Sequence, residues 1–313
     1  MKAITLRQVF GETLLELAEI KKDIVVLDAD ISKSTFSCLF HQKYKDRAYN
    51  LGIAEQNMLG VAAGMASTGI PVFATTYAVF ASMRALEQIR TFICYPQLNV
   101  KVVASHGGLQ VSSDGVSHQG TEDLAIMRSL PNMTVLHPAD PVSTRELVFA
   151  AAGYDGPMYI RLLRNEVPVI YKKDVSFTIG QGNIVKDSKQ AQCTIVATGL
   201  MVEKSLRASE ILEKEGIDVR VLDIHTIKPL DQDLIISSAK KTGVVVTVED
   251  HNIIGGLGGA VAEILGREYP VPIEMVGIND TFGESGDPEE LFTNYQMNIE
   301  HIVAAVKNSI ARR

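Results

Sequence analysis

Residues 5–28, TLRQVFGETLLELAEIKKDIVVLD, place an amphipathic helical pattern directly before a short β-rich run. Thr5-Leu6-Arg7-Gln8 has the form of a capping box, and the apolar residues that follow recur at helical spacing on one face. Ile24-Val25-Val26-Leu27 is then apolar on both faces, which is typical of a strand buried in a parallel sheet. This stretch therefore predicts a helix followed by a buried parallel strand.

The same alternation continues along the chain. Further strands are expected at Pro71–Thr75, Val100–Ser105, Thr134–Leu136 and Met158–Arg161, and a second series at 193–196, 219–222 and 244–248. Strands separated by helices imply right-handed βαβ units and sheets covered on both sides. The predicted fold class is α/β, with two domains that each contain a mainly parallel sheet flanked by helices.

The domain boundaries follow from a change in composition. We expect the first domain at 1–170, a linker at 171–190 and the second domain at 191–313, because the connecting region is richer in Pro, Gly, Lys and Asp and weaker in periodicity.

The composition excludes several classes of protein. The chain has 313 residues, of which 46% are apolar and 21% charged, so it can bury a substantial core. Its net charge of −7 argues against nucleic-acid binding, and no apolar run approaches the ~18 residues of a membrane helix. Cys38, Cys94 and Cys193 are too few and too scattered for a disulfide scaffold, which suits the cytoplasm, where we expect the protein.

A polar segment follows the expected strand Val100–Ser105. Residues 105–120, SHGGLQVSSDGVSHQG, concentrate His106, Asp114 and His118 among Gly and Ser, at a strand end where ligands gather in parallel sheets. We interpret the segment as a loop too polar and flexible to form core. A binding loop and an exposed loop with locally bonded histidines are both open interpretations. A metal site is disfavoured because no nearby Cys or Glu completes a ligand set.

Two other segments offer candidate groups. Glu55 lies in the first turn of a predicted helix, where the helix macrodipole alone favours an acidic residue. Its small and apolar neighbours suggest partial burial, which favours a protonated carboxyl that could donate to a ligand nitrogen. Tyr77, Phe80 and Met83 recur at i, i+3 and i+6, as in a core stripe or, less often, a platform for a ligand.

Other nucleotide and hydrolase motifs are incomplete or missing. Residues 255–261, GGLGGAV, supply only the first two glycines of a dinucleotide fingerprint, and we interpret them as a tight turn with close backbone packing. A nicotinamide enzyme is therefore a weak rival. The sequence contains no P-loop, no nucleophile elbow and no His-Glu-x-x-His motif.

Taken together, these segments resemble the C-terminal half of the thiamine-diphosphate-dependent transketolase family over nearly the whole chain. Residues 50–58, NLGIAEQNM, resemble the family's pyrimidine-domain glutamate motif, and His106, Asp114 and His118 repeat its His…Asp…His order and spacing. Residues 227–230, IKPL, resemble its C-terminal domain. The resemblance implies a pyrimidine-binding domain, a transketolase C-terminal domain and transfer of a two-carbon ketol unit from a ketose phosphate to an aldose acceptor.

The resemblance also implies residue roles around the cofactor. Glu55 would face N1′ of the aminopyrimidine, while Tyr77 and Phe80 would stack on that ring. Met83 stands where many relatives carry a third aromatic residue, so a looser cofactor slot is expected there.

Further roles concern the substrate. His106, Asp114 and His118 would contact substrate hydroxyls and move or stabilise protons. Arg164 falls at the family's phosphate-binding arginine, and Arg161 would either assist it or form a structural ion pair. Asp28 occupies a place where some relatives present Ser near the substrate phosphate, which predicts an unusual substrate because a carboxylate would repel that phosphate.

The sequence lacks the motif with which relatives bind the diphosphate, and this absence predicts a partner subunit. Relatives hold the diphosphate and its Mg²⁺ (or Ca²⁺) through a Gly-Asp-Gly…Asn motif in an N-terminal domain, whereas this chain has only Ser285-Gly286-Asp287-Pro288, far too late. We therefore expect no metal ligand here, an N-terminal partner subunit with the diphosphate-binding domain, pairing of two copies of this chain, and an α2β2 assembly. The alternatives are the β subunit of a 2-oxoacid dehydrogenase first component, a 1-deoxyxylulose-5-phosphate synthase-like enzyme, and a non-catalytic protein that kept the fold.

Overall fold

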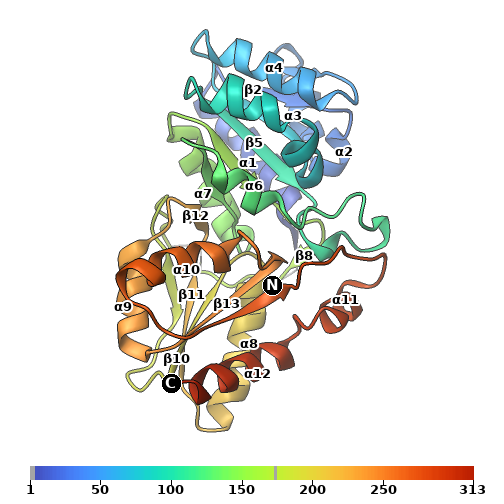
Figure 1. The fold of residues 1–313 in the computed structure, drawn as a ribbon. Coiled ribbons are helices and arrows are strands. Elements are labelled where there is room, and N and C mark those ends of the chain that lie inside the picture. Colours follow the sequence, from blue (N-terminus) through green and yellow to red (C-terminus); the bar gives the residue numbers. More distant parts are fainter. Residues whose placement is uncertain (1–3, 173–174) are drawn as a thin grey trace.

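The computed structural model describes residues 4–172 and 175–313, which form two α/β units joined end to end (Figure 1). The first unit contains β1 (Ile4–Thr5), α1 (Leu6–Ile20), β2 (Val25–Asp28), α2 (Ser32–Thr35), α3 (Cys38–Lys43), η1 (Lys45–Arg47), β3 (Ala48–Asn50), α4 (Glu55–Ala66), β4 (Val72–Tyr77), η2 (Phe80–Arg84), α5 (Leu86–Gln88), η3 (Ile89–Cys94), β5 (Val100–Ser105), η4 (Leu109–Asp114), α6 (Asp123–Ser129), β6 (Thr134–Leu136), α7 (Pro141–Gly153), β7 (Met158–Arg161) and β8 (Glu166–Val167). The second contains β9 (Asn183–Lys186), β10 (Cys193–Ala197), α8 (Met201–Lys214), β11 (Val219–Asp223), β12 (Thr226–Lys228), α9 (Gln232–Thr242), β13 (Val245–Asn252), α10 (Leu257–Glu268), β14 (Ile273–Ile278), α11 (Pro288–Asn294) and α12 (Ile299–Ala311).

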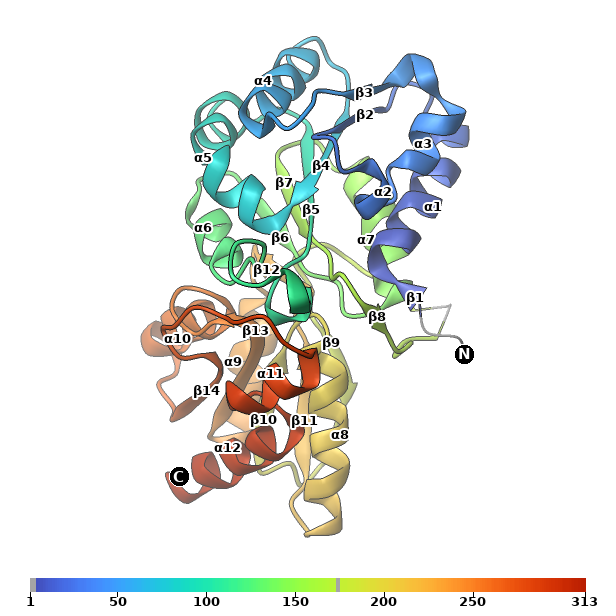
Figure 2. The ribbon, with the colours of Figure 1, turned by 90° about the vertical axis from the view of Figure 1, so that its right-hand side faces the viewer.

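The first sheet has the strand order β12-β6-β7-β5-β4-β2-β3 and is parallel except at β12. Helices α1 and α7 cover one face, and α4 with the segment 80–94 covers the other (Figure 2). Leu6, Phe10 and Leu14 of α1 are fully buried, as the helical spacing predicts. The predicted α/β class and the five strands predicted for this domain are confirmed.

Side chains cap two helix starts in this unit, and the caps differ in detail. Thr5 accepts a hydrogen bond from the Gln8 backbone amide at 3.2 Å, but the Gln8 side chain binds Glu12, so only half of the predicted capping box forms. At α7, Asp140 accepts from the Ser143 amide at 2.7 Å and Pro141 occupies the first helical position, where a missing N–H costs nothing.

The second sheet has the order β14-β13-β10-β11-β9, with α8 and α12 on one face and α9 and α10 on the other. Its β9 is antiparallel to β11 and lies inside the predicted linker 171–190. The sequence missed it because this edge strand offers only Ile184 and Val185 as apolar residues, and neither is fully buried. Within the described residues, no helix is long and apolar enough to cross a bilayer.

One strand of the second domain completes the first sheet. β12 pairs antiparallel with β6, with Thr226 opposite Leu136 and Lys228 opposite Val135. The His137 amide also donates to the His225 carbonyl at 2.9 Å. Residues 226–228 were expected among the elements of the second domain, so the sheets are less separate than the sequence indicates.

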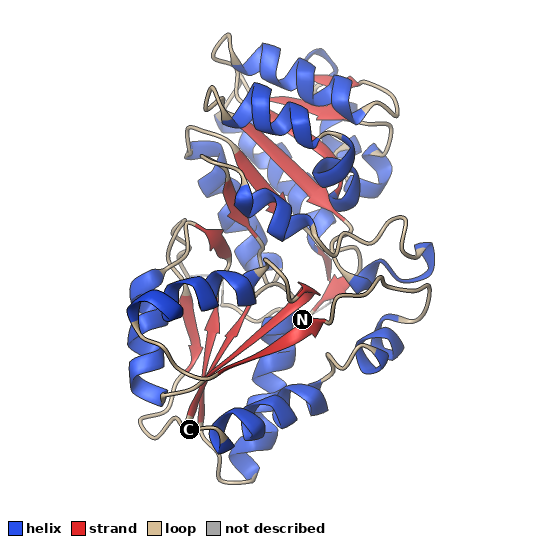
Figure 3. Cartoon of the chain, viewed as in Figure 1, coloured by secondary structure: helices blue, strands red, loops and turns tan. Residues whose placement is uncertain are grey.

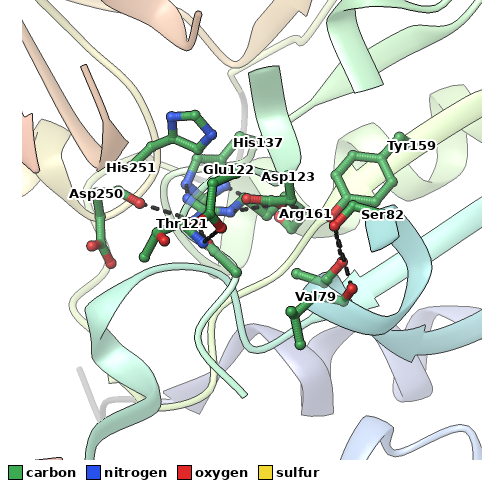
Figure 4. A network of polar contacts seen from close by, with 12 residues as sticks. Val79, Ser82, Thr121, Glu122, Asp123, His137, Tyr159, Arg161, Asp250 and His251 are labelled. Atoms are coloured by element: carbon green, nitrogen blue, oxygen red, sulfur yellow. Dashed lines mark hydrogen bonds and ion pairs between the residues drawn. The ribbon is translucent and has the colours of Figure 1, made fainter. Parts of the chain in front are cut away.

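A buried polar network also joins the domains (Figure 4). Arg161, at the end of β7, is fully buried and lies 3.1 Å from the Asp123 carboxylate. Its guanidinium donates to the carbonyls of Gly120 at 2.7 Å and Asp250 at 2.9 Å, and the second of these belongs to β13. The Tyr159 hydroxyl donates to the same Asp123 carboxylate at 2.6 Å. The network therefore fixes the loop before α6 against the second domain.

We expect Arg161→Met to lower the free energy of unfolding by about 3–5 kcal/mol, because it leaves the buried Asp123 carboxylate without its cation. The matched control is Arg145→Met, which breaks a surface pair with Glu16 and should cost less than about 1 kcal/mol. Urea unfolding of both variants tests the difference, and equal losses would contradict the role given to the network.

Candidate active site

The candidate groups lie at the carboxyl ends of neighbouring parallel strands. The register places Asp28 opposite Thr75, Tyr77 opposite Ser105, and Ala104 opposite Arg161. The ends of β2, β4, β5 and β7 therefore share one edge of the first sheet, and this edge faces the second domain (Figure 3). It is the edge at which ligands gather in sheets of this kind.

Four of the predicted residues form one cluster of rings on this edge. The Tyr77 ring lies 3.9 Å from the His106 ring, 5.5 Å from Phe80 and 6.0 Å from His118, centroid to centroid. The rings of Phe80 and His118 are 5.3 Å apart in an edge-to-face arrangement. Residues that the sequence places up to 41 positions apart, from Tyr77 to His118, are thus in contact.

Glu55 joins this cluster through Arg84, a residue that no sequence motif singled out. Glu55 is the first residue of α4, and its side chain is 6% exposed. Its Oε1 accepts from Arg84 Nη1 at 2.9 Å, and the Arg84 guanidinium carbon lies 3.6 Å from the centre of the Phe80 ring. Arg84 follows Phe80 by four positions, a spacing that puts two side chains on one helix face and could have indicated the contact.

His106 is held as a neutral imidazole. Its side chain is buried, its φ is +65°, and its Nδ1 lies 2.9 Å from the Ser105 hydroxyl. Burial lowers the pKa of His106 to about 3, with further lowering by Arg7, Arg164 and His118. The sequence did not indicate Arg7 as a site residue. Its positive charge nevertheless lowers the pKa of His106, as the charge of Arg164 does.

The aspartate of the His…Asp…His pattern has a different partner. Asp114 Oδ1 lies 3.6 Å from Arg164 Nη2, with both side chains about one-third exposed. Arg164 also donates to the Val111 carbonyl. His118 is half-buried, and its Nδ1 lies 2.9 Å from the Ser117 hydroxyl. The two histidines therefore share the ring cluster, whereas Asp114 is placed with Arg164.

The loop 105–120 contributes to the core, although its composition predicted a loop too polar to do so. Leu109 and Val111 are fully buried, and the Leu109 amide donates to the Asp250 carboxylate at 2.9 Å. The Ser112 hydroxyl donates to the Gly286 carbonyl, and the Gln119 side chain to the Glu284 carbonyl, each at 2.9 Å. The second domain supplies these partners, and that long-range contact is invisible in local composition.

Two predicted substrate contacts are not supported by the structure. Asp28 is fully buried, and its carboxylate accepts from the Ile31 amide at 2.8 Å and from the hydroxyls of Thr75 and Ser37 at 3.0 and 3.2 Å. Burial raises the pKa of Asp28. The Arg161 guanidinium already binds Asp123 and the carbonyls of Gly120 and Asp250, in the network that joins the domains. Both side chains thus already have polar partners within the chain. Their roles toward the substrate stay predictions.

The glycine turn before α10 packs as the sequence indicates. The Glu249 carboxylate accepts from the backbone amides of Leu257 and Gly258 at 2.6 and 2.7 Å. A Cβ on Gly256 would overlap this carboxylate. The helix terminus that would receive a dinucleotide phosphate is thus taken by the chain's own Glu249, which removes the nicotinamide rival.

No cluster of three or more His, Cys, Asp or Glu side chains within residues 4–172 and 175–313 is arranged to hold a metal ion. The remaining predicted cofactor contact, Met83, has an exposed side chain at 49%. Its role stays a prediction.

The structure thus comprises two α/β domains, with a buried glutamate, a cluster of tilted rings and two histidines at the strand ends of the first. Family models give the class of these domains: residues 2–169 match the transketolase pyrimidine-binding domain and residues 180–302 match the transketolase C-terminal domain. The chain therefore belongs to the transketolase family, which depends on thiamine diphosphate, and the predicted family resemblance is confirmed.

Similar proteins include one named as a C-terminal section and one named as a subunit. A protein of Methanocaldococcus jannaschii that carries the name of a transketolase C-terminal section is 45% identical over 98% of this chain and 96% of its own length. The 6-deoxy-6-sulfo-D-fructose transketolase subunit SqwH of a Clostridium species is 40% identical over 98% and 95%. A solved chain described as a split-gene transketolase in an inactive β4 tetramer is 49% identical, with a TM-score of 0.92 over 99% of this chain and 100% of that chain.

We expect the His106→Asn variant to be less sensitive to acid than the parent chain. The unfolded chain binds a proton on this imidazole below its usual pKa of 6.5, whereas the folded chain does not until about 3. The free energy of unfolding therefore falls as the pH drops between these values, by up to about 1.4 kcal/mol per pH unit.

Urea unfolding at pH 7 and pH 5 measures this effect. The loss of stability between the two pH values should be smaller in the variant by about 1–2 kcal/mol. His225, whose pKa burial lowers to about 4, is unchanged in both proteins and serves as an internal reference. An identical acid loss in both would show that His106 accepts protons freely in the fold.

Proposed function

We propose that this chain is the β subunit of a thiamine-diphosphate-dependent transketolase that transfers a two-carbon ketol unit between a ketose phosphate and an aldose acceptor. The carrying observation is the convergence of Glu55, Tyr77, Phe80, His106 and His118 at one strand edge. This set lies in a chain whose residues 2–169 and 180–302 match the pyrimidine-binding and C-terminal models of the family.

The residues present fit an aminopyrimidine. A buried carboxylate can share a proton with a ring nitrogen, and the faces of Phe80 and Tyr77 offer an apolar slot. Bound thiamine diphosphate supplies a nucleophilic carbon and an electron sink for carbon–carbon bond cleavage. Glu55 would hold the proton at N1′, while Tyr77 and Phe80 would orient the ring and exclude water.

The groups beyond the ring cluster suit a sugar with an anionic end. His106, neutral at physiological pH, can either donate to or accept from a substrate hydroxyl. His118 and Asp114 would serve the same hydroxyls. Arg164 would bind the phosphate, assisted by Arg7, because both charges act on His106. A guanidinium fork can also donate hydrogen bonds to a sulfonate, and the name of the Clostridium relative includes a sulfo sugar.

The remaining parts of the site would come from other chains. We assign the diphosphate and its Mg²⁺ (or Ca²⁺) to an N-terminal partner subunit, with two copies of each chain in an α2β2 assembly in the cytoplasm. Relatives that are themselves separate C-terminal chains support a split enzyme. The description of the similar β4 tetramer as inactive supports a need for the second subunit.

The test is to purify this chain with and without a co-expressed diphosphate-domain partner. We expect no appreciable thiamine diphosphate binding or ketol transfer by the chain alone, and both in the complex. Within the complex, Glu55→Gln should lower kcat by about 10²–10⁴-fold, the range for lost general acid–base function. Binding is measured by calorimetry and transfer by product analysis.

The control is Glu213→Gln, an exposed glutamate of α8 that pairs with Lys186. It should leave turnover unchanged. Turnover of sugars by the isolated chain with only cofactor and magnesium would contradict the split site. A parallel assay replaces the ketose phosphate by pyruvate with glyceraldehyde phosphate. Turnover with pyruvate in place of the ketose would favour the 2-oxoacid dehydrogenase or 1-deoxyxylulose-5-phosphate synthase alternatives.

Arg164→Met should raise KM for a phosphorylated ketose by about 10–100-fold, because a charge-assisted fork to phosphate is lost. KM for the matching ketose without phosphate should change little. Steady-state kinetics of the complex with each of the two donors measure both KM values. An equal rise in KM for both donors would show that Arg164 acts through the fold of the 105–120 loop instead.

A further inference from the structure

Arg84 contacts both of the groups that the proposed function assigns to the cofactor ring. Its Nη1 lies 2.9 Å from Glu55 Oε1, and its guanidinium carbon lies 3.6 Å from the Phe80 ring centroid. A guanidinium is flat, carries its N–H groups in its own plane and stacks on aromatic faces. An aminopyrimidine has the same combination of a planar face and nitrogen atoms that pair with a carboxyl.

The ion pair with Arg84 compensates the charge of the buried Glu55 carboxyl. The Glu55 side chain is 6% exposed, and an ionised carboxyl at that burial is costly without a partner. The Arg84 side chain is 48% exposed, so it can neutralise Glu55 from the solvent side and can leave without opening the core. Arg84 also lies within the π-helical turn η2, which begins at Phe80 and continues from the end of β4.

Resting on the proposed function, we infer that Arg84 is a stand-in for the cofactor ring. Its guanidinium occupies Glu55 Oε1 and one face of Phe80, and thiamine diphosphate must displace it to reach that oxygen and that face. Arg84 thereby protects the buried carboxylate until the partner subunit delivers the cofactor, and it competes with the cofactor for the same two contacts.

The experiment uses Arg84→Met in the complex with the diphosphate-domain partner, because Met keeps an unbranched apolar stem and loses the charge and the fork. We expect thiamine diphosphate to bind about 5-fold more tightly and to associate faster than in the parent complex. In the isolated, cofactor-free chain the same substitution should lower the Tm, because Glu55 loses its cation. Calorimetry, stopped-flow fluorescence and thermal unfolding give the three readouts.

Two further variants sharpen the result. Arg84→Lys keeps the charge without the planar fork and should give an affinity between those of the parent and Arg84→Met. Arg267→Met, a substitution of an exposed arginine of α10, controls for the change in net charge and should alter neither affinity nor association rate.

The outcomes separate this inference from the proposed function. Weaker or unchanged cofactor binding by Arg84→Met, in a complex whose parent binds the cofactor, would overturn the stand-in role and leave the transketolase assignment intact. Weaker binding would mean that Arg84 stays beside Glu55 and supports the bound ring. A parent complex that binds no thiamine diphosphate would overturn both proposals.

Discussion

The buried Arg161 guanidinium is the interaction on which the geometry of the candidate site depends. It needs several acceptors because a cation without them could not stay in the core, and it finds Asp123 and the carbonyls of Gly120 and Asp250. Gly120 ends the segment that begins at His106, and Asp250 belongs to the second domain. One side chain therefore fixes the far end of the histidine loop and the contact between the domains.

This constraint explains why the site forms at a domain boundary rather than within one sheet. The parallel register alone brings Tyr77 beside Ser105. The strand register does not position residues 107–119, because these residues belong to no strand of the sheet. The Asp250 carboxylate and the carbonyls of Glu284 and Gly286 hold the loop instead. His118 reaches the rings of Tyr77 and Phe80 because the second domain closes this loop over the strand edge.

The sequence predicted those features that depend on local pattern. Buried parallel strands such as β5 are continuous apolar runs, and the polar segment after β5 stands at the position where such sheets bind ligands. The sequence could not predict β12, because its three residues pair with a strand about 90 positions earlier. The role given to Asp28 came from the family resemblance, which says nothing of its neighbours in this chain. Nearby hydroxyls and the Ile31 amide bind its carboxylate, and these contacts depend on the fold.

Under the proposed function, a divided active site changes the demands on Glu55. A carboxyl that would meet a ring nitrogen must be sheltered from water, yet a chain that carried only half of the site would have to fold before the ring arrives. Burial alone would leave the carboxylate uncompensated, and an internal, fully buried cation would bind it too firmly to release it. Arg84 meets both demands because it is attached at the rim, half-exposed and stacked on Phe80. The same exposure that weakens the ion pair in water makes it reversible.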